Sequence, residues 1–175
     1  MDSRQFKKIV SATLKEAGFA QHGSRWVFET GELAWIIELE KSRYSDRWNV
    51  GVGVSLGPTG SRIAPTLNAC AIQIGYELLP HGVPASAATS RFNDHRSYFS
   101  MVLDLGHDLL SDKERADAVQ FMATSLKEMV ELATSTEDLA RLYRRGNFKA
   151  GFVSRKFKEE MESLVPNGDG ADSSE

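Results

Sequence analysis

Four histidines are the side chains of this sequence best suited to acid–base or metal chemistry, because imidazole titrates near neutral pH and binds metal ions. They lie in a predicted turn (His22), in an irregular stretch over residues 80–96 (His81 and His95) and after a predicted strand (His107). No two of them have the His-x-His or His-Glu-x-x-His spacing that places two ligands on one metal ion. We therefore expect no metal centre.

Asp104, His107 and Asp108 come nearest to a cluster of acid–base or metal-binding side chains. In an extended chain, side chains three positions apart point to opposite faces, and Gly106 then turns the backbone. The simpler interpretation is a strand end with solvated polar groups. An active site that combines Asp104 and His107 with the 80–96 stretch, as in a small hydrolase or a metal enzyme, stays open as an alternative.

No other pattern indicates a nucleophile or a bound cofactor. Cys70 is the only cysteine and alternates with Ile72 and Ile74, which predicts a buried, small apolar role in a strand. Residues 57–62 superficially resemble a phosphate loop but lack its Gly-Lys-Ser/Thr ending, so we expect a plain loop. The Gly-x-Ser-x-Gly spacing occurs at residues 53–57, but Ser55 lies inside a predicted strand over 48–56 and not at the strand-to-helix turn of a nucleophile elbow. These observations favour a non-enzymatic role without a cofactor.

A basic stretch lies between residues 141 and 158, where seven cations occur without an acid. They are Arg141, Arg144, Arg145, Lys149, Arg155, Lys156 and Lys158. Such a stretch fits an acidic protein surface or a phosphate backbone. The alternative is a solvated helical surface that the following Glu159, Glu160 and Glu162 partly neutralise.

The element that must position any site is a hairpin of residues 25–30 and 33–40, in which large apolar side chains alternate with smaller or polar ones. Residues 31–32, Gly-Glu, fit a type II′ turn, and this turn pairs Phe28 with Trp35. The turn and the alternation agree on the register. The large side chains expected on one face are Trp26, Phe28, Trp35 and Ile37.

The next strand covers residues 48–56, with large apolar side chains at its even positions and Asn, Gly, Gly and Ser at its odd ones. Gly51 and Gly53 indicate a bare surface that a ligand or another backbone can approach closely. Close packing of another element of the chain, or simple tolerance at a solvent face, is the alternative. Two further strands are predicted over residues 70–77 and 98–105 by the same alternation.

Helical spacing predicts a first helix over residues 3–17, ended by Gly18. Ser111 and Glu114 form a capping box that opens a long helix, and Ser135 and Asn147 cap two shorter ones. The expected buried stripe of the long helix is Ala116, Val119, Met122, Ala123, Leu126, Met129, Val130 and Ala133.

These elements predict a single α+β domain over residues 1–165, with a disordered acidic tail over 166–175. We expect a roughly five-stranded, mainly antiparallel sheet, with an N-terminal helix and about three C-terminal helices packed on one face. The other face would then be open. The polar side chains expected there, as a candidate binding surface, are Glu38, Glu40, Gln73 and Glu77.

Composition sets broad limits on the class of protein. The chain has 175 residues, 41% hydrophobic and 26% charged, with a net charge of −3. This charge is too small to indicate a nucleic acid or a membrane as the partner. The single cysteine and the lack of an apolar leader suit the cytoplasm.

Several segments together resemble the bacterial family known as domain of unknown function 4304, over about residues 3–150. They are Leu14 to Phe19, Trp26 to Phe28, Trp35 to Ser42, Val50 to Val54, Cys70 to Gly75 and the C-terminal helices. The resemblance implies a compact bacterial domain without an established reaction or cofactor, and it carries over no functional residue.

The sequence therefore favours a non-enzymatic, protein-binding module of a bacterial cell, with an immunity-like or regulatory role. A nucleic-acid-associated protein that uses the basic stretch is one alternative. A small hydrolase or metal enzyme without a recognisable motif is another.

Overall fold

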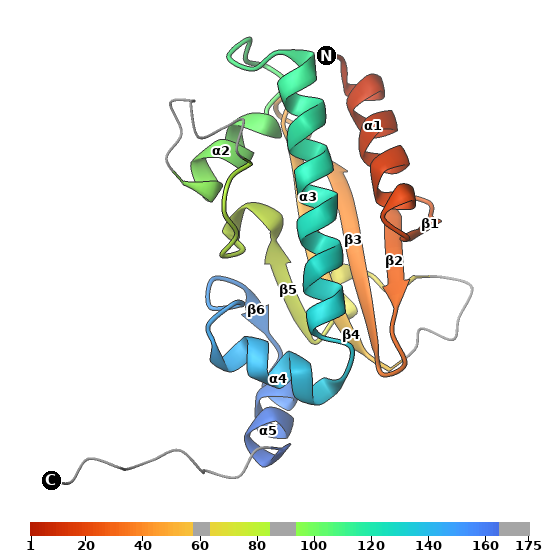
Figure 1. Cartoon of the computed structure of the whole chain (residues 1–175), viewed down its shortest axis with the longest axis vertical. Coiled ribbons are helices and arrows are strands. Elements are labelled where there is room, and N and C mark those ends of the chain that lie inside the picture. Colours follow the sequence, from red (N-terminus) through yellow and green to blue (C-terminus); the bar gives the residue numbers. More distant parts are fainter. Residues whose placement is uncertain (58–63, 85–93, 165–175) are drawn as a thin grey trace, which may run out of the picture.

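Six antiparallel strands form one sheet in the order β1-β2-β3-β4-β5-β6 (Figure 1). The computed structural model describes residues 1–57, 64–84 and 94–164. The strands are β1 (Ala20–His22), β2 (Arg25–Glu29), β3 (Leu33–Lys41), β4 (Trp48–Leu56), β5 (Ile72–Gly75) and β6 (Phe152–Val153). The described α-helices are α1 (Ser3–Glu16), α2 (His95–Val102), α3 (Asp112–Leu132), α4 (Thr136–Arg144) and α5 (Arg155–Leu164). Two 3-10 helices, η1 (Leu67–Ala69) and η2 (Tyr76–Leu78), flank β5.

The main hydrophobic core lies between the sheet and its helices, with α1 and α3 side by side across one face (Figure 1). Trp26, Trp35 and Ile37 of the central hairpin are at most 1% exposed there, and Phe28 packs against them. The register pairs Trp26 with Ile37 and Phe28 with Trp35, which confirms the expected hairpin and the expected α+β class. Among the described residues, no helix has both the length and the apolar character to cross a membrane.

The turn of this hairpin differs from the expected type II′ turn, because Gly31 does not have a positive φ. The Thr30 side chain closes the turn instead, since its Oγ1 accepts a hydrogen bond from Leu33 N at 3.2 Å. In the preceding turn, between β1 and β2, Gly23 does take a positive φ, of +67°. Strand β1 itself was not predicted, because its three residues are all exposed and show no alternation of burial.

The second face of the sheet is not open along its whole length, as the sequence led us to expect. Residues 64–70 cross it, and a second small core forms there, with Leu67 packed against it. Its buried members are Val27, Ala34, Ile36, Ala64 and Cys70. A Cβ on Gly51 would lie 2.2 Å from Leu67 Cδ1, and one on Gly53 would lie 2.7 Å from Cys70 Sγ. The two glycines therefore admit a segment of the same chain, which is the packing alternative.

The fourth predicted strand is shorter than expected, because β5 ends at Gly75 and η2 follows. Cys70 is buried, at 4% exposure, but it does not share a face with Ile72 and Ile74. It lies at the end of η1 and packs on the second face over Gly53. The expected alternation therefore began two residues too early.

The strand predicted over residues 98–105 is wrong, because helix α2 occupies most of it. Asp94 caps this helix by accepting hydrogen bonds from Ser97 N at 2.9 Å and from Ser97 Oγ at 2.7 Å. The helix buries Tyr98, Phe99 and Val102, a helical rather than an alternating pattern.

The helix predicted over residues 147–164 is wrong in its first part, where the chain turns and then forms β6. Strand β6 pairs with β5, as Val153 with Ile72 and Phe152 with Gln73. A Cβ on Gly151 would lie 2.6 Å from the backbone oxygen of Gln73, so this approach needs a glycine. Helix α5 begins after Ser154, whose Oγ accepts a hydrogen bond from Phe157 N at 3.3 Å.

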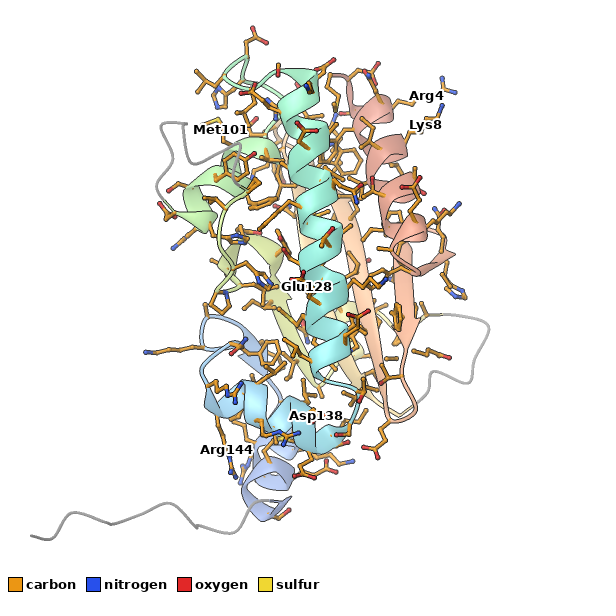
Figure 2. The ribbon with its side chains drawn as sticks, viewed as in Figure 1. Arg4, Lys8, Met101, Glu128, Asp138 and Arg144 are labelled. Atoms are coloured by element: carbon orange, nitrogen blue, oxygen red, sulfur yellow. The ribbon has the colours of Figure 1, made fainter. Side chains whose placement is uncertain are left out.

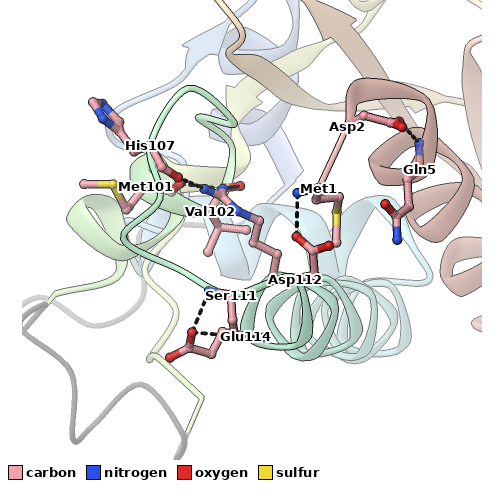
Figure 3. A network of polar contacts seen from close by, with 10 residues as sticks. Met1, Asp2, Gln5, Met101, Val102, His107, Ser111, Asp112 and Glu114 are labelled. Carbon is pink, nitrogen blue, oxygen red and sulfur yellow. Dashed lines mark hydrogen bonds and ion pairs between the residues drawn. The ribbon is translucent and has the colours of Figure 1, made fainter.

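The helix starts at Ser111 and Ser135 are confirmed, each with a complete capping box. In the long helix α3, Ala116 is half-buried, and Arg115 and Ala118 join the expected buried stripe. Figure 3 shows the start of α3, where the amino group of Met1 lies 2.5 Å from Asp112 Oδ1. The predicted tail over 166–175 and most of the predicted 57–62 loop lie outside the described residues.

Candidate functional site

Three of the four polar residues expected on an open sheet face are half-buried, and Glu40 is exposed. Glu38 is half-buried, and its Oε1 accepts a hydrogen bond from Arg25 Nε at 3.2 Å. Arg25 also donates to the backbone oxygen of Ala64 at 3.0 Å, so Glu38 and Arg25 help to hold residues 64–70 on the sheet. Glu40 is exposed near the end of β3.

Gln73 and Glu77 are both half-buried. Gln73 lies between Gly53 of β4 and Phe152 of β6. Glu77 belongs to η2 rather than to the strand. Its carboxylate lies close to Gly75, since a Cβ on Gly75 would be 3.0 Å from Glu77 Oε2. These two side chains are therefore part of the packing around β5.

The basic stretch is divided among α4, the turn after it and α5, and several of its cations have local partners. Arg141 pairs with Asp138, and Arg155 Nε lies 2.8 Å from Glu159 Oε1. Arg144 donates to the backbone oxygen of Met161 at 3.3 Å. These local pairs agree with the alternative interpretation of a partly neutralised helical surface, although Arg145, Lys149 and Lys156 remain exposed.

Asp104 and His107 do meet, although the expected strand would have kept them apart. His107 Nε2 lies 3.4 Å from Asp104 Oδ2, and Asp104 Oδ1 accepts a hydrogen bond from Gly106 N at 3.0 Å. In the described part of the chain, no group of three or more His, Cys, Asp or Glu side chains is placed to hold a metal ion. The pair therefore closes a turn at the end of α2.

His81 and His95, from the irregular stretch, pack together on Tyr76. Their ring centroids are 5.7 Å apart, and they lie 5.9 Å and 5.0 Å from the Tyr76 ring. Both nitrogens of His95 face backbone oxygens, Nδ1 at 2.9 Å from Gly82 and Nε2 at 3.0 Å from Tyr76. Burial, and then the neighbouring His95, lowers the pKa of His81 to about 4. His95 therefore ties Gly82 and Tyr76 to α2, and residues 85–93 of this stretch lie outside the described residues.

A different surface brings four cations together around a concavity, the groove between α1 and β1. Its cavity volume is about 460 Å³. We call it the α1 groove and define it by Arg4, Lys7, Lys8, Ser11, Lys15 and Gln21.

Local structure explains why these side chains share one side of α1. Helix α1 buries its apolar stripe, which includes Phe6, Val10 and Leu14, so the residues between them face outward. Figure 2 shows Arg4 and Lys8 projecting from α1 away from the sheet. Gly18, with φ of +99°, then ends the helix and brings β1 beneath it.

Two hydrogen bonds of Gln21 fix the floor of the α1 groove. Ser11 Oγ donates to Gln21 Oε1 at 3.0 Å, and Gln21 Nε2 donates to the backbone oxygen of Gly23 at 3.0 Å. The side chain of Gln21 is therefore held on the α1 side of β1. The hydrogen bond between Ser11 and Gln21 joins α1 to the edge strand β1.

The four cations of the α1 groove are exposed, and none of them makes an ion pair with a described residue. The acid that α1 itself carries is Glu16, which does not line the groove. Uncompensated cations around a concavity attract carboxylates or phosphates.

The α1 groove was not predicted, although the helical spacing of Arg4, Lys7, Lys8 and Lys15 places these cations on one side of the first helix. This charge pattern, opposite the apolar stripe, is the signal in the sequence that indicates the groove. The edge strand that completes the groove could not be recognised from three exposed residues.

Comparison of the chain with models of known families, with curated proteins and with solved structures gives no match. The resemblance to domain of unknown function 4304 stays a prediction.

Proposed function

We propose that this chain is a protein-binding module that holds an acidic segment of a partner protein in the α1 groove. The observation that carries the proposal is the set of four exposed cations, none of which pairs with an acid of the described residues, around a groove whose floor is already ordered. Binding of an acidic segment therefore breaks no ion pair that the structure describes.

Charge across the whole chain favours an acidic protein over a nucleic acid. The net charge is −3 and the isoelectric point is about 5.8, whereas surfaces that bind nucleic acids are strongly positive. The second basic region, between residues 141 and 158, has ion pairs at Arg141 and Arg155. A protein segment needs only a local patch of complementary charge, which steers association and fixes the partner's orientation.

An immunity-like or regulatory role agrees with such a module, since both require reversible binding to one partner. Neither role needs a reacting group or a cofactor. This expectation, made from the sequence, stays a prediction.

Fluorescence anisotropy with a labelled peptide of alternating Glu and Thr, at low salt, tests the proposal. The double substitution Lys7→Glu and Lys8→Glu is expected to weaken binding at least about tenfold, because close charge pairs contribute on the order of 1.5 kcal/mol or more. Lys149→Glu with Lys158→Glu is the matched control, since it changes the net charge equally on exposed side chains of the basic stretch. The control is expected to change binding by no more than about threefold.

Two outcomes would overturn the proposal. Equal losses in both double variants would show that only net charge matters. Tighter binding of a single-stranded DNA of similar length, through the same Lys7 and Lys8, would assign the groove to a nucleic acid instead.

A further inference from the structure

The outer edge of β1 lies beside the α1 groove and is the end of the sheet. Strand β1 pairs with β2 alone in the described sheet, and all its residues are exposed. A two-residue turn, with Gly23 first, separates His22 from its partner Arg25. In such a hairpin the closing pair exchanges hydrogen bonds, so the next residue, Gln21, turns its backbone N–H and C=O toward the free edge.

The side chains of a strand added to this edge would alternate between the two faces of the sheet. Gln21 is paired with Trp26, whose side chain is in the core beneath the helices, and its own side chain reaches Ser11 of α1. Residues of an added strand that share the face of Gln21 would therefore point toward the cations of α1. The residues between them would point to the opposite face.

The spacing of side chains on one side of α1 matches the spacing of side chains on one face of an added strand. Four residues of a helix rise about 6 Å, and two residues of an antiparallel strand extend about 6.8 Å. Lys15, Ser11, Lys8 or Lys7, and Arg4 follow each other at this helical spacing. From Lys15 to Arg4 the helix rises about 16 Å, a length that an extended segment of five or six residues covers.

We infer, on the basis of the proposed function, that the partner's acidic segment adds to β1 as a further strand and carries its acidic residues at alternate positions. Main-chain hydrogen bonds to Gln21 supply part of the affinity, and the alternate carboxylates supply the selection. Such binding also covers an exposed strand edge that would otherwise be free to pair with another chain.

Two peptides of identical composition test the inference, one with alternating Glu and Thr and one with all the Glu residues in a block. We expect the alternating peptide to bind at least about fivefold more tightly. It should also slow hydrogen exchange of the Gln21 amide at least about tenfold, with no such change at the amide of Phe157 in α5, which follows β6 at the other end of the sheet order from β1.

Substitution at the edge gives a second readout. Gln21→Pro removes the backbone N–H that points away from β2, and edge strands tolerate a proline at such a position. Gln21→Ala keeps this N–H. We expect Gln21→Pro to lose the preference for the alternating peptide and Gln21→Ala to keep it, with circular dichroism showing that both variants fold.

The outcomes separate the two proposals. If both peptides bind equally and still require Lys7 and Lys8, the strand addition is wrong and the proposed function stands. If neither peptide depends on Lys7 and Lys8, both proposals are wrong.

Discussion

At the scale of single residues, Arg115 is the buried side chain with the most demanding environment. It is 2% exposed, and its guanidinium donates to Met101 O at 3.0 Å, to Val102 O at 2.7 Å and to His107 O at 2.6 Å. Burial lowers its pKa, against the opposing effect of nearby carboxylates, of which Asp104 is the largest. A cation at the last carbonyls of α2 also complements the helix dipole. Arg115 therefore joins the end of α2 to α3.

Replacing Arg115 with Met is expected to lower the free energy of unfolding by about 3 kcal/mol, because buried carbonyls lose charged donors. Arg115→Lys, which keeps the charge but not the planar fork, should give an intermediate loss. Urea denaturation measures both. Lys113→Met, on the exposed side of the same helix, is the control and should stay within about 0.5 kcal/mol. If Arg115→Met also lowers the free energy of unfolding by no more than about 0.5 kcal/mol, Arg115 does not join α2 to α3 as assigned.

His81 makes stability depend on pH. Its pKa of about 4 in the folded state is lower than the ordinary value of 6.5, because of burial and the neighbouring His95. The unfolded chain therefore binds more protons between pH 6.5 and 4. The contribution of neutral His81 is complete above pH 6.5 and is lost as the pH falls to about 4, by up to about 3 kcal/mol.

The variant His81→Phe keeps a ring beside Tyr76 and cannot titrate, so its stability should fall less over this range. His81 Nε2 is buried without a hydrogen-bond partner, and its removal therefore costs little. Chemical denaturation at pH 7 and pH 4.5 measures the difference. Parallel losses in the two proteins would contradict the prediction.

At the scale of elements, the sequence was sufficient to predict a helix or strand where two local signals agreed. The central hairpin had both an alternating pattern and a turn of the right length, and its register was correct although the turn type was not. Ser111 and Ser135 marked two helix starts, because capping is local chemistry. For α2, the sequence carries both the Asp94 and Ser97 cap of a helix and an alternation of Phe99, Met101 and Leu103 that favours a strand, so the local signals conflict.

Elements that depend on distant contacts could not be predicted. Strand β6 has two residues, and it exists because Gly151 lets the chain reach the backbone of Gln73. Residues 64–70 show no period, yet they cover Gly51 and Gly53. The partial burial of Glu38 beside this segment could not be predicted either, whereas the cations of α1 are visible in a single helix.

Two glycines with positive φ connect the elements of the α1 groove, and they should respond differently to substitution. At Gly18, φ is +99° and a Cβ would lie 3.1 Å from the Phe28 ring, whereas at Gly23, φ is +67° and nothing lies within 4 Å. We expect Gly23→Ala to cost about 1 kcal/mol from backbone strain alone. Gly18→Ala should cost more, about 2 kcal/mol, because the ring must also move.

Thermal or urea denaturation of the two variants measures this difference, and Gly31→Ala is the control. Gly31 has no positive φ and no neighbour within 4 Å of a Cβ, so its substitution should have almost no effect. Equal costs at Gly18 and Gly23 would show that Phe28 moves freely.

At the scale of the whole molecule, the sheet has two unequal coverings. The helices bury the large core on one face, and residues 64–70 bury a small one on the other. The small core contains mainly short side chains, so less apolar area opposes its opening. We expect residues 64–70 to detach locally while the sheet and its helices stay folded, as low-stability segments do.

Cys70 can report this opening, because it is the only cysteine and lies in the small core. Burial raises the pKa of its thiol to about 11. In the closed state a reagent therefore cannot reach the thiol, and only a small fraction of it is in the reactive thiolate form. At pH 8 we expect a thiol reagent to label native protein at least about 1,000-fold more slowly than unfolded protein. Leu67→Ala should accelerate native labelling at least about tenfold, since Leu67 packs over Gly51 and Gly53.

The urea midpoint of Leu67→Ala should change much less than its labelling rate, because the helical core is not touched. Leu109→Ala, at a side chain that is 55% exposed, is the control and should alter neither quantity. If labelling instead rises with urea in step with global unfolding, and Leu67→Ala shifts both equally, the two coverings open as one cooperative unit. In that case the second face would be as inaccessible as the core, and a partner could reach the sheet at its exposed edges, of which β1 is one.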